Sequence, residues 1–272
     1  MRRVAPPTGG GACHHRRETA MDVSGSSVIV TGAASGLGAA TAKRFAEAGA
    51  TVFGLDLQPS IDKATPAENV HLVATDVTKE DEVLAAIAEA VKAGPLRVAV
   101  NCAGVGWAGR ILSKNGPHAL ELFQTVININ LVGTFNVMRL AADQMSKQET
   151  VDAQGSRGLI VNTASVAAFE GQIGQIAYTA SKGGVHAMTI TAARDLAQFG
   201  IRVNTIAPGI INTPMLAGVT PEFKQTLEAG VPFPQRLGEP SEYADLAYFL
   251  SQHDYLNGET VRMDGAIRMA PR

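Results

Sequence analysis

The chain has 272 residues, enough for one large domain with a sizeable core, and nothing in its composition requires two domains. Its formal net charge of −2 provides no general attraction for nucleic acid or anionic membranes, so neither partner is expected. Two cysteines, Cys13 and Cys102, are too few for a disulfide framework. No apolar run has transmembrane length and no signal-peptide core is found, so we expect a cytoplasmic protein, or a mitochondrial matrix protein if the source is eukaryotic.

Residues 1–20 differ in composition from the rest of the chain. Four arginines stand against one acid there, with two prolines and a glycine run and without a hydrophobic period. We expect a disordered extension over 1–20 and a folded domain over 21–272. A transit segment is one interpretation, but proline and glycine oppose the amphipathic helix that it needs. We prefer to explain the composition of residues 1–20 by an extended reading frame, or by a sequence added before Met21.

A short buried strand over 28–30 precedes the turn TGAASGLG and an amphipathic helix to about residue 48. This order builds a pyrophosphate cradle, because glycines let the backbone come close and a helix N-terminus favours anions. The next strand, 51–55, ends at Asp56, whose carboxylate can accept hydrogen bonds from both ribose hydroxyls of NAD and repels the extra phosphate of NADP. Ser35 stands where an NADP enzyme often has a basic residue. Both features favour NAD.

Two further strands, 70–75 and 97–100, end in residues suited to a cofactor. Asp76-Val77 follows the first and can reach an adenine ring by side chain and backbone. The small-residue segment Asn101-Cys102-Ala103-Gly104 follows the second and leaves room for a cofactor against the backbone. Cys102 is interpreted as a packing residue rather than a nucleophile, because no base lies near it in the sequence.

A polar loop, 105–118, leads into a long helix that carries Asn130 among apolar neighbours. Asparagine is mildly unfavourable inside a helix, so we expect its side chain to be bound to another group. A fifth strand, 158–161, leads to Ser165. The later pair Tyr178 and Lys182 is separated by four residues, so in a helix both side chains project from one face.

These residues define a candidate catalytic centre. A phenol needs its pKa lowered by about three units, about 4 kcal/mol, to exchange protons at neutral pH. An ammonium about 4 Å away would supply that at an effective dielectric constant near 20, so we expect Lys182 to make Tyr178 acidic. Ser165 could hydrogen-bond a substrate oxygen beside the phenol. A buried tyrosine with a lysine one turn on is the plain alternative, because this spacing alone is a weak signal.

The helix after Tyr178 is apolar on more than one face, so part of it is expected to pack against another subunit. A sixth strand, 201–207, precedes Pro208-Gly209. The region 210–236 looks mobile and offers Ile210, Ile211, Met215, Leu216 and Phe223 to an apolar pocket.

A helix over 240–251 and a strand near 259–263 end the chain. The alternation of strands and helices predicts an α/β single-domain Rossmann fold, a doubly wound parallel sheet of about seven strands. The scattered histidines have no ligand spacing, so no metal site is predicted.

Taken in order, the motifs from about residue 25 onward resemble the short-chain dehydrogenase/reductase family. Within that family, the stretches NTASVAAFEGQIGQIAYTASKGG, SKNGPHALELF and VPFPQRLGEPSEYA and the ending DGAIRM are similar to type 2 3-hydroxyacyl-CoA dehydrogenases. The matching motifs are the glycine turn, Asp76-Val77, Asn101 to Gly104, Asn130, Ser165, Tyr178-x-x-x-Lys182 and Pro208-Gly209. The residues after Gly209 and the loop around Trp107 depart from the pattern.

The resemblance implies a homotetrameric, NAD-dependent oxidoreductase that interconverts 3-hydroxyacyl-CoA and 3-ketoacyl-CoA without a metal. The implied catalytic residues are Asn130, Ser165, Tyr178 and Lys182, with Asn130 holding a water behind Lys182. The implied cofactor-binding residues are Gly32, Ser35, Leu37, Gly38, Asp56, Asp76, Val77, Asn101, Cys102, Ala103, Gly104, Tyr178, Lys182, Pro208, Gly209, Ile211 and Thr213. The implied substrate-binding residues are Ser165, Gln172, Gln175 and Tyr178.

Three alternatives stay open. A 17β-hydroxysteroid or other secondary alcohol would fit an apolar pocket, but Arg110 and Lys114 on the long loop could meet CoA phosphates. An NADPH-dependent 3-oxoacyl carrier-protein reductase would use the same catalytic set, although Asp56 and Ser35 oppose NADPH. A structural partner in an RNA-processing complex is the alternative without catalysis.

Overall fold

A computed structural model describes residues 21–216 and 218–271, so the extension predicted over 1–20 lies outside the described residues. Seven parallel strands form one sheet in the order β3-β2-β1-β4-β7-β8-β9. The predicted doubly wound sheet is therefore confirmed, and each predicted strand lies within two residues of its observed bounds. The strands are β1 (Ser27–Thr31), β2 (Thr51–Asp56), β3 (Val70–Ala74), β4 (Leu96–Asn101), β7 (Gly158–Thr163), β8 (Ile201–Pro208) and β9 (Thr260–Met263).

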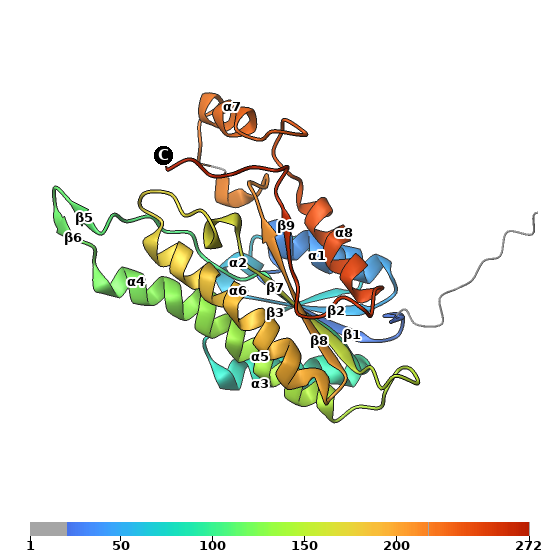
Figure 1. Cartoon of the computed structure of the whole chain (residues 1–272). Coiled ribbons are helices and arrows are strands. Elements are labelled where there is room, and N and C mark those ends of the chain that lie inside the picture. The colour runs from blue at the N-terminus through green and yellow to red at the C-terminus, as the bar shows by residue number, and fades with distance from the viewer. Residues whose placement is uncertain (1–20, 217, 272) are drawn as a thin grey trace, which may run out of the picture.

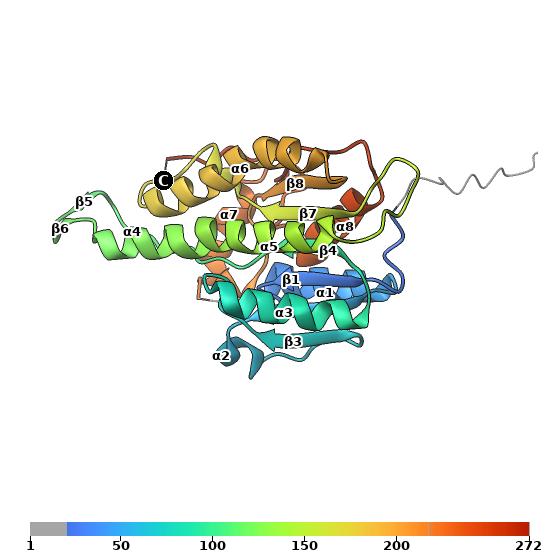
Figure 2. The same cartoon turned by 90° about the horizontal axis from the view of Figure 1, so that it is seen from below.

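Successive residues of a strand point to opposite faces of the sheet, and in this sheet both sets are apolar. Helices therefore cover both faces. Val28 and Val30 pack with α1 (Gly36–Glu47) and α8 (Pro240–Ser251) on one face. Ile29 packs on the other face with α3 (Glu80–Ala93) and α5 (Thr134–Ser146), and α6 (Ile176–Ala197) belongs to the same layer. Figure 2 shows α3, α5 and α6 side by side along this face.

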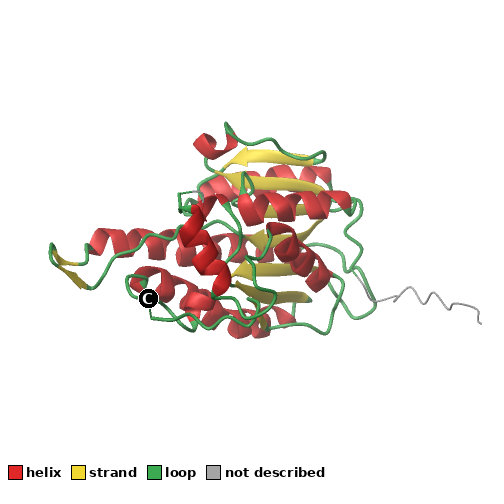
Figure 3. Cartoon of the chain, turned by 90° about the horizontal axis from the view of Figure 1, so that it is seen from above, coloured by secondary structure: helices red, strands yellow, loops and turns green. Residues whose placement is uncertain are grey.

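Because the seven strands are parallel, their carboxyl ends lie at one edge of the sheet. Figure 3 shows the sheet in yellow between its covering helices. Strand order reverses between β1 and β4, and loops that leave neighbouring strands in opposite directions open a crevice at such a point. The turn after β1 and the segments after β4, β7 and β8 therefore meet there. This edge contains the sequence motifs of every predicted site.

The segments between the main elements contain structure that the sequence did not predict. The loop 105–118 forms a two-stranded hairpin, β5 (Leu112–Ser113) and β6 (Gly116–Pro117), which projects from the body beside α4 (Leu120–Ile127) in Figure 1. The region predicted to be mobile contains η3 (Pro214–Leu216) and α7 (Pro221–Ala229). Two short helices, α2 (Gln58–Ile61) and η2 (Val166–Ala168), complete the elements of these segments.

The long predicted helix is present, but its middle is a π-helical turn. Helix α4 continues into η1 (Asn128–Gly133) and then into α5 without a break. Such turns occur often at functional sites, and this one contains Asn130. Among residues 21–216 and 218–271, no helix combines the length and apolar character needed to span a bilayer.

Candidate active site

A cavity of about 1040 Å³ extends along the carboxyl edge of the sheet. Most predicted site residues line it, including the catalytic group Ser165, Tyr178 and Lys182 and the substrate residue Gln175. The predicted cofactor residues that line it are Gly32, Ser35, Leu37, Gly38, Asp56, Asp76, Val77, Cys102, Ala103, Gly104, Tyr178, Lys182, Pro208, Gly209, Ile211 and Thr213.

Three predicted site residues are not among those that line the cavity. Asn101 is buried, and its Nδ2 donates to Asn162 Oδ1 at 2.9 Å. Gln172 turns its side chain to the C-terminal segment, where Nε2 donates to the carbonyl of Ala270 at 3.0 Å. Asn130 is fully buried. Each of these side chains is held by a protein group instead of facing the cavity.

Two glycines let α1 begin directly against β1 and β4. A Cβ on Gly38 would lie 2.1 Å from the carbonyl oxygen of Gly32, and a Cβ on Gly32 would lie 2.9 Å from the nitrogen of Ala103. Gly32 also has φ +68°, which side chains rarely adopt. Among the described residues, no side chain caps α1, since Ser35 makes no such bond. Its first backbone N–H groups are left for an anion, as a pyrophosphate cradle requires.

Asp56 is oriented by the backbone on both sides of its carboxylate. The amide of Ala34 in the glycine turn donates to Oδ2 at 3.0 Å, and the amide of Leu57 donates to Oδ1 at 2.8 Å. The carboxylate therefore lies beside the glycine turn, at the end of β2. A ribose whose phosphates sit at the start of α1 would have its hydroxyls within reach of this group.

Ser165, Tyr178 and Lys182 come together from two elements. Ser165 follows β7, where its Oγ accepts a hydrogen bond from the Ala167 amide at 3.1 Å. Tyr178 lies in the first turn of α6, and Lys182 follows one turn later. The Lys182 ammonium donates to the carbonyl of Thr163 at 2.7 Å and lies 5.8 Å from the centre of the Tyr178 ring.

The expectation that Lys182 makes the phenol acidic is wrong for the protein alone. Burial raises the pKa of Tyr178, and a hydrogen bond with Ser165 offsets only part of that rise. Burial also lowers the pKa of Lys182 to about 8. A low-dielectric site disfavours phenolate and ammonium alike, and this ammonium is bonded to a carbonyl rather than to the phenol.

Asn130 has a bound side chain, as its apolar neighbours predicted. Its Oδ1 accepts from the Val105 amide at 2.8 Å, and its Nδ2 donates to the Val105 carbonyl at 2.9 Å and to Ser181 Oγ at 3.0 Å. A Cβ on Gly104 would lie 3.0 Å from Asn130 Oδ1 and 3.6 Å from Lys182 Nζ. Asn130 therefore supports the cavity wall directly behind Lys182.

Cys102 lines the cavity and is interpreted, as before, as a packing residue. Burial raises the pKa of its thiol, which keeps the sulfur protonated and weakly nucleophilic. Its Sγ lies 3.7 Å from the Tyr243 hydroxyl and 3.8 Å from the Thr163 hydroxyl.

Known proteins are similar to this chain over most of its length. A family model described as short chain dehydrogenase matches residues 26–223. The chain belongs to the short-chain dehydrogenase family. It is thus an oxidoreductase that acts on CH–OH groups, and short-chain dehydrogenases of this kind use NAD(H). The resemblance inferred from the motifs is confirmed.

Relatives within the short-chain dehydrogenase family extend over almost the whole chain. The chain is 52% identical over 256 residues to the 3-hydroxyacyl-CoA dehydrogenase type-2 of Bos taurus, covering 92% of this chain and 97% of that one. It is 36% identical to a 3-oxoacyl-[acyl-carrier-protein] reductase of Thermotoga maritima, covering 91% and 99%. A crystal structure of 3-hydroxyacyl-CoA dehydrogenase type-2 from Mycobacterium avium superimposes with a TM-score of 0.85 at 46% identity, covering 91% and 98%.

Part of the cavity wall of this short-chain dehydrogenase carries no sequence signal, and one further predicted wall residue lies elsewhere. Met269, near the end of the chain, lines the cavity, and so do Trp107 and Ala108 from the long loop. Phe223 was expected in the wall but lies exposed on α7. No local pattern marks Met269, because its place depends on how the chain returns after the last strand.

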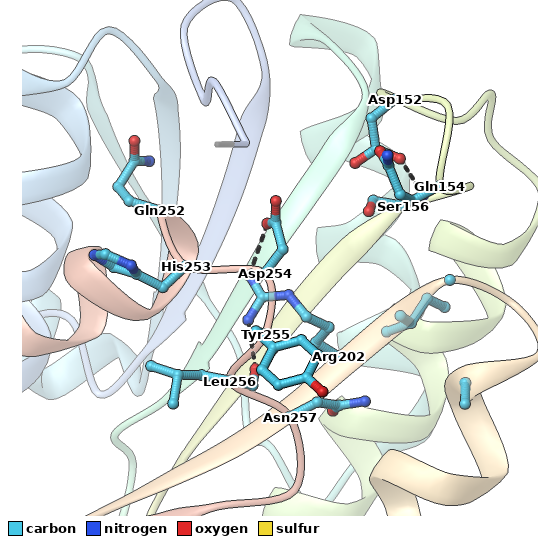
Figure 4. Close-up of a pocket in the computed structure, with 13 residues that line it drawn as sticks. Asp152, Gln154, Ser156, Arg202, Gln252, His253, Asp254, Tyr255, Leu256 and Asn257 are labelled. Carbon is cyan, nitrogen blue, oxygen red and sulfur yellow. Dashed lines mark hydrogen bonds and ion pairs between the residues drawn. The ribbon is translucent and has the colours of Figure 1, made fainter. Parts of the chain in front are cut away.

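This short-chain dehydrogenase has a second cavity, of about 750 Å³, near the amino ends of β7 and β8 (Figure 4). Its buried cation is Arg202, which donates to the carbonyls of Leu256 at 2.8 Å and Leu250 at 2.9 Å. The same guanidinium pairs with Asp254 at 3.8 Å, the pair that a dashed line marks in Figure 4. These bonds hold the connection between α8 and β9, so we assign Arg202 a structural role.

Proposed function

We propose that this short-chain dehydrogenase interconverts 3-hydroxyacyl-CoA and 3-ketoacyl-CoA, with NAD(H) as its cofactor, in fatty-acid or branched-chain acyl-CoA oxidation. One observation carries the proposal. The Ser165, Tyr178 and Lys182 constellation lines a cavity in a chain that is 50–53% identical to enzymes named 3-hydroxyacyl-CoA dehydrogenase type-2 from five animals.

In the direction of oxidation, Tyr178 acts as the base. Its phenolate takes the proton of the substrate hydroxyl, while Ser165 hydrogen-bonds the same oxygen and fixes its direction. Bound NAD would supply the acceptor for the C3 hydride of the substrate. In reduction Tyr178 gives the proton back, so one hydroxyl serves both directions.

Lys182 has two roles in this proposal. It would hold the nicotinamide ribose of bound NAD, and in its neutral form it receives the proton that Tyr178 takes from the substrate. Its lowered pKa of about 8 suits the second role, because both of its protonation states are then accessible near neutral pH. Asn130 is a positioning residue in this scheme, since it fixes the backbone of Val105 beside Gly104.

NAD is proposed over NADP because of the charge beside the glycine turn. The Asp56 carboxylate is fixed there by two backbone amides, and an added 2′-phosphate would meet that charge. Ser35 adds no cation to compensate.

A homotetramer is proposed as the assembled form, and the occupant of its interfaces is a second copy of this chain. Large apolar side chains are exposed on neighbouring helices: Val132 on η1, Phe135 on α5, and Ile176 and Ile190 on α6. Covering such side chains lowers the free energy of association. No nucleic-acid partner is proposed, given the net charge of −2.

A panel of substrates on one preparation tests the function. We expect reduction of acetoacetyl-CoA with NADH to have the highest kcat/KM. Acetoacetyl-CoA with NADPH, an acetoacetyl carrier protein with either nicotinamide, and oxidation of estradiol with NAD should each be at least tenfold less efficient, which corresponds to about 1.4 kcal/mol of transition-state stabilisation. A higher value for the steroid, or for the carrier protein with NADPH, would replace the acyl-CoA assignment with the corresponding alternative.

A further inference from the structure

After β9 the chain reverses and returns along the carboxyl edge of the sheet. The reversal uses Gly265 and Ala266, with φ of +57° and +64°, a conformation that is costly for alanine. Asp264 supports it, because its Oδ1 accepts a hydrogen bond from the Ala266 amide at 3.0 Å. Ile267 is then buried, which anchors the segment that follows.

Four charged side chains meet where the returning segment crosses the loop after η2. Glu170 accepts two hydrogen bonds from the Arg262 guanidinium, at 2.8 and 3.1 Å, and Arg262 Nε donates to Asp264 Oδ2 at 2.8 Å. Arg268 pairs with Glu170 at 3.4 Å and with Asp264 at 3.2 Å. We call Glu170, Arg262, Asp264 and Arg268 the tail clamp.

The tail clamp is stronger than an ordinary surface ion pair. Three of its side chains are mostly buried, with exposed fractions of 25% for Glu170, 20% for Arg262 and 8% for Asp264, so water screens their contacts poorly, whereas Arg268 is 62% exposed. The two hydrogen bonds between the Arg262 guanidinium and the Glu170 carboxylate fix the relative orientation of the two groups in addition to their distance. In agreement, the Arg262 guanidinium holds the pKa of Glu170 below its usual value, so the carboxylate stays charged at neutral pH.

The end of the chain is then bonded along the loop that leads into α6. The Met269 amide donates to Glu170 Oε2 at 3.3 Å. Gln172 Nε2 donates to the Ala270 carbonyl at 3.0 Å, and the Ile173 amide donates to the Pro271 carbonyl at 3.0 Å. Met269 lines the same cavity as Tyr178.

Met269 lies at the substrate end of that cavity rather than at its cofactor end. The loop that it contacts through Glu170 follows Ser165 and leads to Tyr178, the two residues proposed to bind the reacting oxygen of the substrate. Asp56 and the glycine turn are at the ends of β2 and β1, on the other side of the crevice.

We propose that the tail clamp holds the C-terminal segment as a wall of the substrate site, so that Met269 determines which acyl-chain lengths are accepted and Glu170 is a positioning residue for that wall. This inference rests on the proposed acyl-CoA activity. It adds to that activity a specificity determinant from the end of the chain.

Two substitutions of Met269 test the wall. We expect Met269→Ala to raise the ratio of kcat/KM for 3-ketooctanoyl-CoA over acetoacetyl-CoA by about tenfold, and Met269→Trp to lower it by about tenfold, because pocket contacts of this size discriminate by such factors. KM for NADH should not change in either variant. Leu84→Ala, an exposed leucine on α3, is the control. An unchanged ratio in both Met269 variants, or shifts in the reversed directions, would overturn the proposal that Met269 determines chain length.

Glu170→Gln tests the clamp without relying on any substrate. It keeps the size of the side chain and removes the charge, so the Ile173 and Met269 amides should exchange hydrogen faster by about tenfold or more. Because the loosened wall gives a longer acyl chain more room, the ratio of kcat/KM for 3-ketooctanoyl-CoA over acetoacetyl-CoA should rise about fivefold, with KM for NADH unchanged. Glu89→Gln, from the exposed pair with Lys92 on α3, is the matched control. Unchanged amide exchange would overturn the proposal that the tail clamp holds the C-terminal segment. A wild-type enzyme without acyl-CoA turnover would instead overturn the proposed function.

Discussion

The cavity lined by Tyr178 and the cavity lined by Arg202 lie at opposite edges of one sheet and differ in how their polar groups are bonded. At the carboxyl edge, α1 begins without a side-chain cap and the Asp56 carboxylate is oriented by backbone amides beside it. At the amino edge, the charged group is the guanidinium of Arg202, and its donors are bonded to carbonyls of the chain. A polar group whose hydrogen bonds are made to the protein supports the fold, whereas backbone N–H groups that no side chain caps at a cavity are available for a ligand.

The largest effect should come from removing one hydroxyl at the carboxyl edge. Tyr178→Phe keeps the ring in place and removes the proton donor and acceptor, so kcat should fall about 10³-fold while folding is retained. NAD binding should survive, and it can be followed by the fluorescence of Trp107, which lines the cavity. Tyr255→Phe, at the other cavity, is the matched control and should leave kcat unchanged.

The pH dependence of the wild-type enzyme completes this test. Burial raises the pKa of Tyr178, so the protein alone favours the protonated phenol. Oxidation needs the phenolate, so its rate should rise with pH, while reduction needs the phenol and should be favoured at lower pH. Retained turnover in Tyr178→Phe, or oxidation that is fastest at low pH, would contradict this role of the phenol.

At the amino edge, a substitution is expected to lower stability and to leave substrate binding unchanged. Arg202→Met leaves the carbonyls of Leu250 and Leu256 without their donor and removes the partner of Asp254. Breaking one side of such a buried pair typically lowers the free energy of unfolding by about 3 kcal/mol. Urea unfolding at pH 7 would measure the loss, and KM values of the remaining folded enzyme should be unchanged. Lost activity with unchanged stability would show that this cavity also binds a ligand.

The same contrast explains how far the sequence could predict the structure. Seven strands and the helices between them follow from local periodicity, and the motifs after β1, β2, β4 and β7 meet because all strands are parallel. The hairpin β5–β6 has strands of two residues, too short for any period. Met269 contacts Glu170 from 99 positions away, a distance over which local patterns carry no information. The sign of the pKa shift at Tyr178 depended on burial, which spacing alone does not give.

The smallest effect should come from the projecting loop, where both predicted CoA-binding cations are exposed. Arg110 follows Gly109, whose amide donates to the Gly174 carbonyl at 2.7 Å beside Gln175 in the cavity wall. Lys114 lies further out, in the turn between β5 and β6. Exposed charges contribute little and are screened by salt, so Arg110→Ala should raise KM for acetoacetyl-CoA about threefold and Lys114→Ala less than that, both less at high salt.

The phosphates of CoA provide the decisive comparison for these two variants. Acetoacetyl-pantetheine has the same reacting group without the nucleotide phosphates, so its KM should be the same in wild type, Arg110→Ala and Lys114→Ala. Lys43→Ala, an exposed lysine on α1, should leave KM unchanged for both substrates. Equal losses with the two substrates would mean that Arg110 shapes the cavity wall through the Gly109–Gln175 contact instead of binding phosphate. In that case the loop would belong with the clamped C-terminal segment as part of the substrate wall.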